Sequence, residues 1–127
     1  MCDAQRSLKR TRMLVALSQA IAHRVAQEYE AGILQQDFEL EYLNDALWKA
    51  TRFGFEARVV EPAGNQIMTM GEHTELMVNY LESSLIELGT ADIIPTVEEV
   101  VAGGSEARQQ LEVFQQGGFA LLQKMLM

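Results

Sequence analysis

Two cations one helical turn apart, Lys49 and Arg52, have the spacing in this chain that best suits chemistry. Side chains at i and i+3 lie on one face of a helix, so both could contact the same anionic group. Arginine offers a carboxylate or phosphate two parallel hydrogen bonds, and lysine adds a point charge. The pair also suits a structural role, because cations in the last turn of a helix oppose the negative end of its dipole. The spacing alone favours this structural role.

A change in hydrophobic period predicts the elements that position this pair. A helix is expected from an N-cap at Asp37 to a glycine stop at Gly54. Residues 55–60 then alternate as in a strand, "EPAGNQ" at 61–66 is a turn, and "IMTM" at 67–70 is a short partner strand. The helix is expected to bury an apolar stripe of Leu43, Leu47 and Ala50, flanked by Tyr42 and Trp48.

Four more helical segments and a final apolar piece are expected around this hairpin. The first spans about 7–30, and the next runs from a capping box at Thr69 and Glu72 to Gly89. A short helix with Pro95 in its first turn closes at 103–104, and Ser105 caps another that ends at 117–118, before an apolar piece at 119–126. Their expected buried residues are Leu14, Leu17, Ile21 and Val25, then Leu76, Met77, Tyr80, Leu81, Leu85 and Leu88, and finally Leu111 and Phe114.

The predicted fold is therefore a single domain over 1–127, mainly α with one small β-hairpin near 55–70. An isolated two-stranded hairpin is only marginally stable in water. We therefore expect this one to pack on helices or to extend another sheet.

Charge and composition exclude several classes of function. The net charge is −8, with five cations against three acids in residues 1–30 and five against fifteen in residues 31–127. Such an acidic body does not suit general nucleic-acid binding, which needs clustered Lys and Arg. The single cysteine, Cys2, excludes an internal disulfide and suits a reducing compartment.

We expect no membrane partner and a cytoplasmic location. The stretch at 8–22 resembles a signal peptide only loosely, because Ser18 and Gln19 interrupt its apolar part. No apolar run reaches the ~18 residues that a membrane span needs.

Metal and phosphate-loop chemistry lack their usual motifs. His23 and His73 each lack a second ligand at i+3 or i+4, so structural or surface roles are expected for both. The glycine pairs at 103–104 and 117–118 are read as helix ends, since neither has the strand–loop–Lys arrangement of a phosphate loop.

Four stretches together resemble one family. They are "MCD" at 1–3, "ALSQAIAHRVAQE" at 16–28, "WKATRFGFEARVVEP" at 48–62 and "ELGTADIIPTVEEVVAGGSEARQQLEVFQQGG" at 87–118. Their order and spacing are similar to the C-terminal part of the bacterial carboxylate–amine ligases of glutamate–cysteine ligase type 2. The chain departs from the family's pattern at Ala46, Leu47 and Phe53, where Asn, Arg and Tyr are common.

The resemblance implies the C-terminal portion of an α+β glutamine-synthetase-like fold. It implies a ligase that uses ATP and magnesium, held by upstream strands, to activate a small-molecule carboxylate as an acyl phosphate for attack by an amine. It raises Arg52 to a catalytic candidate, with Lys49 and Asp3 as substrate- or phosphate-binding candidates and no metal ligand in this chain. We expect the chain alone to be incomplete and inactive, and a homo-oligomer.

An alternative reading stays open. The chain could be a stand-alone, non-catalytic helical module for dimerisation or regulation. An apolar patch left by a missing neighbour would promote association under either reading.

Overall fold

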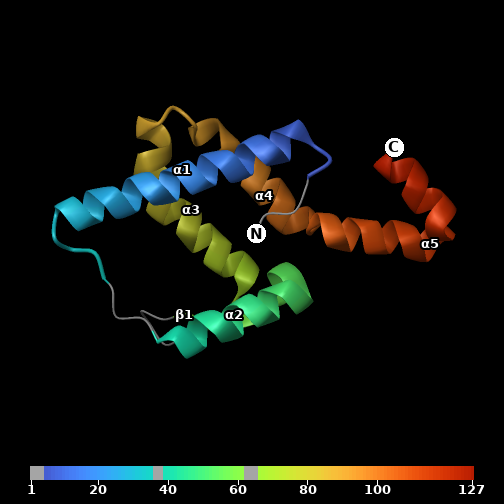
Figure 1. The fold of residues 1–127 in the computed structure, drawn as a ribbon, viewed down its shortest axis with the longest axis horizontal. Coiled ribbons are helices and arrows are strands. Elements are labelled where there is room, and N and C mark those ends of the chain that lie inside the picture. The colour runs from blue at the N-terminus through green and yellow to red at the C-terminus, as the bar shows by residue number, and fades with distance from the viewer. Residues whose placement is uncertain (1–4, 36–38, 62–65) are drawn as a thin grey trace.

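The computed structural model describes residues 5–35, 39–61 and 66–127, and within them the chain is mainly helical with one two-stranded hairpin (Figure 1). This confirms the predicted fold class at that level. The elements in chain order are α1 (Leu8–Glu30), α2 (Leu40–Phe53), the 3₁₀ helix η1 (Gly54–Glu56), β1 (Arg58–Glu61), β2 (Gln66–Thr69), α3 (Met70–Glu87), the 3₁₀ helix η2 (Ala91–Ile93), α4 (Ile94–Gly103) and α5 (Glu106–Leu126).

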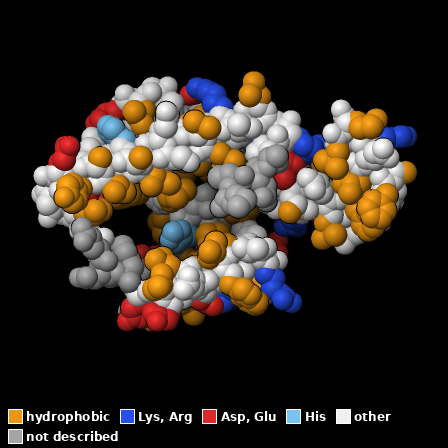
Figure 2. Space-filling view, in the orientation of Figure 1, with side chains coloured by type: hydrophobic (Ala, Val, Ile, Leu, Met, Phe, Trp, Pro, Cys, Tyr) orange, Lys and Arg blue, Asp and Glu red, His pale blue; other side chains and the backbone are white. Residues whose placement is uncertain are grey.

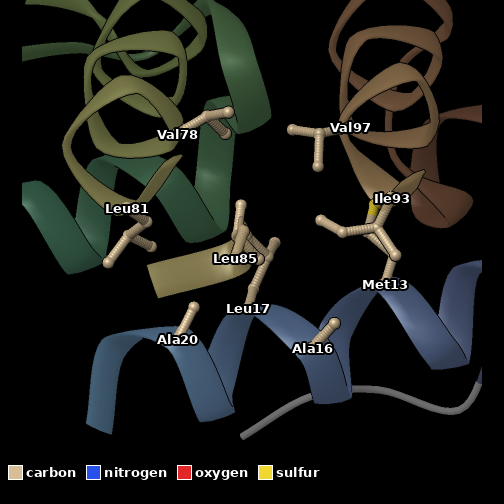
Figure 3. Packing of buried hydrophobic residues seen from close by; sticks show 9 residues of the cluster. All are labelled: Met13, Ala16, Leu17, Ala20, Val78, Leu81, Leu85, Ile93 and Val97. Carbon is tan, nitrogen blue, oxygen red and sulfur yellow. The ribbon is translucent and has the colours of Figure 1, made fainter. Parts of the chain in front are cut away.

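The hydrophobic core lies where α1 crosses α3, and η2 and α4 close one side of it (Figure 3). Leu81 and Leu85 of α3 are fully buried against α1. On α1 the side chains at this crossing include Ala16 and Ala20, which are small enough to let the two helix backbones approach closely. The other members of the buried cluster are Met13, Leu17, Val78, Ile93 and Val97.

The predicted buried stripes of α1 and α3 are only partly correct. Ile21 and Val25 remain 42% and 40% exposed, whereas Ala16 and Ala20 are buried. On α3, Leu76, Tyr80 and Leu88 are exposed, and the buried face contains Val78 and Ser84 beside the two leucines. The prediction assigned burial to the large aliphatic residues and so misplaced both buried faces. Two crossing helices bury whichever residues lie at their contact, and these include small residues.

The hairpin is joined to α3 without a linker. β1 and β2 are antiparallel, with Arg58 opposite Thr69. Thr69 is also the N-cap of α3 and forms the predicted capping box with Glu72. The backbone N–H of Met70 donates to the carbonyl oxygen of Ala57 at 2.7 Å, which ties the first turn of α3 to the residue before β1.

The strand prediction at 55–60 is wrong at its start. Gly54 ends α2 as predicted, with φ +62°, and the chain then forms one 3₁₀ turn closed by the Ala57 N–H and the Gly54 carbonyl. Strand pairing therefore begins only at Arg58. The buried Ala57 and Val59 lie on the packed face, so the hairpin packs on helices α2 and α3 as its marginal stability requires.

Helix α2 has no buried residue, which contradicts the predicted burial of Leu43, Leu47 and Ala50. The helix is amphipathic, but it contacts chiefly β1 and η1. Hydrophobic side chains gather on the facing sides of α1 and α2, around an open hollow (Figure 2). The sequence pattern was correct about the apolar face and wrong about its burial.

Helix α5 extends away from the core as an arm (Figure 1). It bends at Gly117 and Gly118, which confirms the predicted break there, while Leu111 and Phe114 are exposed rather than buried. Its base is fixed by the buried carboxylate of Glu106, which forms ion pairs with Arg6 at 2.9 Å and Arg10 at 3.2 Å.

A pair of leucines on α3 tests this assignment of the core. We expect Leu81→Ala to lower the free energy of unfolding by about 2–5 kcal/mol, because it empties a closely packed site. Leu76→Ala, on the exposed face of the same helix, should cost about 0.5 kcal/mol or less. Urea unfolding of both variants measures this; equal losses would contradict the assignment.

Candidate anion-binding groove

A groove of about 410 Å³ opens where the last turn of α2, η1 and the start of β1 meet. Its lining residues are Lys49, Phe53, Glu56, Ala57 and Arg58. Its volume falls in the range of small-molecule sites. The sharp turn at Gly54 brings the end of α2 and the start of β1 to one place.

Lys49 lines this groove with its ammonium group already paired. Its Nζ lies 2.6 Å from Oδ2 of Asp45, one turn earlier on α2. The carboxylate offsets part of the charge of Lys49 and holds its side chain in one direction. Lys49 is therefore positioned to contact a ligand, but it would attract an anion less strongly than an unpaired lysine.

Arg52 lies beside the groove on a pair of aromatic rings. Its guanidinium carbon is 5.6 Å from the ring centres of both Trp48 and Phe53, which meet edge to face. Such cation–π contacts stabilise an exposed arginine modestly. The two predicted cations therefore differ in position. Lys49 lines the groove, and Arg52 lies on the rings of Trp48 and Phe53. Their roles stay predictions, and Asp3 lies outside the described residues.

Arg58 is a groove residue that the sequence reading missed as a site candidate. It was assigned only to the alternation of a strand. The available signal was its position, six residues after Arg52 and just beyond the glycine stop of the helix. In the structure it is exposed at the first position of β1.

The ion pairs among the described residues set Arg52 and Arg58 apart. Seven of the ten Lys and Arg residues pair with a described acid, and they are Arg6, Lys9, Arg10, Arg12, Arg24, Lys49 and Arg108. In the same part of the chain, Arg52, Arg58 and Lys124 form no such pair. Of these three cations only Arg58 lines the groove, in a chain with net charge −8.

Two acids that could pair with Arg58 are held by other groups. Glu56 lines the groove, but its carboxylate pairs with Arg108 at 2.7 Å. The carboxylate of Glu72 accepts from the Thr69 N–H at 2.7 Å and from its hydroxyl at 3.0 Å. These two hydrogen bonds, with a smaller contribution from the charge of Arg58, hold the pKa of Glu72 below its ordinary value.

His23 has the structural role expected of it, while the role of His73 stays a prediction. His23 joins α1 to α3, with Nδ1 3.1 Å from the buried Ser84 hydroxyl and Nε2 3.3 Å from Glu87. Among the described residues, no three His, Cys, Asp or Glu side chains come together in a way that could hold a metal ion. Within the same residues, no helix has the length and apolar character to span a membrane.

Comparison with known proteins decides the family. The model of glutamate–cysteine ligase family 2 matches residues 1–124. The chain belongs to this family. A Gloeobacter violaceus protein is 26% identical over 115 residues, and a Bordetella parapertussis protein is 31% identical over 108; both are named "Putative glutamate–cysteine ligase 2". The recognised resemblance is thereby confirmed.

The family members are much longer than this chain. The match covers 91% of the chain but 31% of the Gloeobacter protein, and 84% of the chain but 25% of the Bordetella protein. The chain therefore spans between a quarter and a third of these relatives. No solved structure matches it at a significant level.

The capping box of Thr69 and Glu72 predicts that the stability of the fold depends on pH. Because the folded pKa of Glu72 lies below the ordinary value of 4.5, its bonds add stability that is complete above that pH. This stability is lost as the pH falls through the lowered folded pKa. Wild type should therefore be more stable than Glu72→Gln at about pH 6, and the difference should shrink at about pH 3. Thermal unfolding at both pH values measures this; a constant difference would refute it.

Proposed function

We propose that the chain is the C-terminal portion of an ATP-dependent carboxylate–amine ligase. The observation that carries the proposal is the family match over residues 1–124, together with the names of the relatives. The names of the relatives support glutamate and cysteine as the proposed substrates. A glutamine-synthetase-like fold for the complete enzyme and a cytoplasmic location belong to the same proposal.

The proposed reaction has two balanced steps. A substrate carboxylate oxygen attacks the terminal phosphorus of ATP, which forms an acyl phosphate and releases ADP. The amine nitrogen then attacks the acyl carbon, and phosphate leaves with its bonding electron pair while the nitrogen gives up a proton. Both steps transfer charge onto phosphate oxygens, so positioned cations stabilise them. Arg52 is proposed as the catalytic contact, with Lys49 and Asp3 binding substrate or phosphate.

Magnesium does not fit the described residues of this chain, since they bring together no cluster of candidate ligands. The proposal therefore places the metal–ATP carboxylates in the part of the relatives that this chain does not match. It follows that the chain alone should be inactive, and that its contribution is the cationic groove and the packing around it.

A second candidate is a helical module that self-associates, and its exposed surface favours it. The accessible surface is 9011 Å². A compact monomer of 14.2 kDa exposes about 6,800 Å², so the excess is on the order of 2,200 Å². An excess of this size is comparable with what one partner buries in an obligate interface. If the chain is such a module, a second copy covers this excess surface in the expected homo-oligomer.

A chimera tests the ligase proposal. This chain replaces the matching segment of the Gloeobacter violaceus protein, and phosphate release is measured with glutamate, cysteine, ATP and magnesium. We expect turnover from the chimera and none from the 127-residue chain. The second candidate predicts no turnover in the chimera, and this result separates the two, because both allow the chain to dimerise.

The role of Arg52 is tested in the same chimera. Arg52→Ala should lower turnover about a hundredfold, the cost of removing one charge-stabilising donor, with nearly unchanged folding. The matched control is Arg12→Ala, another exposed arginine, which pairs with Asp92 far along the chain. Unaltered kinetics in Arg52→Ala would leave Arg52 as a helix-end cation stacked on two rings.

A further inference from the structure

The groove has one lining cation that forms no direct ion pair within the described part of the chain. Lys49 is paired with Asp45, and Glu56 is paired with Arg108. Arg58 forms no ion pair with any described residue, although it also lines the groove. Its guanidinium is therefore the group of the groove best able to bind an incoming anion.

Glu72 is not readily available to form an ion pair with Arg58. Its carboxylate is held by the N–H and hydroxyl of Thr69, which is directly opposite Arg58 in the hairpin register. The charge of Arg58 contributes to the lowered pKa of Glu72, although the two side chains form no ion pair with each other. Moving Glu72 onto Arg58 would break the capping box of α3, which opposes such a rearrangement.

The groove combines the guanidinium of Arg58 with an apolar wall. Phe53 supplies the wall, and Lys49 supplies a second positive group on the same groove. Guanidinium groups recognise planar carboxylates and phosphoryl groups through two parallel donors. The lining thus suits an oxyanion attached to a small apolar body.

We propose that Arg58 anchors an oxyanion-binding site in this groove, with Lys49 as its second cation and Phe53 as its apolar wall. The ligand group is a carboxylate or a phosphoryl group. The inference rests on the proposed function only for the source of that group, a substrate carboxylate or the phosphates of ATP. Its test reads binding by the 127-residue chain without turnover.

The test is an NMR titration of the ¹⁵N-labelled chain at constant ionic strength. Pyrophosphate represents the phosphoryl source and glutarate the carboxylate source. We expect one of them to shift the amide signals of η1 and β1, and this identifies the source. Arg58→Gln should weaken that binding about tenfold, the effect of losing a charge-assisted hydrogen bond. Arg58→Lys, which keeps the charge but not the paired donors, should lie between.

Lys124→Gln is the matched control, because it also removes one unpaired cation and lies on the distant arm α5. Its affinity should equal that of wild type. The proposal is overturned if neither anion shifts the groove signals, or if Lys124→Gln and Arg58→Gln weaken binding equally, which would indicate general charge attraction. Either result would overturn the anion site without deciding the proposed function, which the turnover of the chimera tests separately.

Discussion

The close crossing of α1 and α3 is the contact on which the rest of the molecule depends. Ala16 and Ala20 let the helices approach, so that Leu81 and Leu85 are removed completely from water. Removing such side chains from water is the main favourable contribution to the stability of a small domain. Helix α4 packs onto the same two helices, while α2 and α5 do not reach this core. The fold is thus a compact three-helix core to which α2, the hairpin and α5 are appended.

The groove is appended to this core through the first turn of α3. The hydrogen bond from Met70 to Ala57 and the capping box at Thr69 fix the hairpin to that helix end. Gly71 contributes as well, because an added Cβ would lie 3.3 Å from Val101 and 3.6 Å from the carbonyl of Phe55. Local hydrogen bonding and close backbone packing, rather than a large apolar interface, therefore position the cations of the groove.

Features set by neighbouring residues were predictable from the sequence, and features set by distant contacts were not. The capping box, the end of α2 at Gly54 and the kink at Gly117 follow from local chemistry, and all three were predicted. The buried faces depend on which helices meet, so Ser84 and Ala20 were missed and Leu47 was wrongly placed inside. Of the predicted pair, Lys49 lines the groove and Arg52 stacks on Trp48 and Phe53, an arrangement that the spacing alone did not specify. Arg58 could be singled out only once the ion pairs of the other cations were visible.

Hydrogen exchange of the 127-residue chain tests this account most directly. Amides of α3 around Leu81 and Leu85 should exchange slowest, near the rate set by global unfolding, because they lie in the packed core. Those of α2 and α5, which bury little, should exchange much faster in the monomer. If α2 proved as protected as α3 in a monomeric sample, the groove would belong to the core itself, and the division into core and appended elements would be wrong.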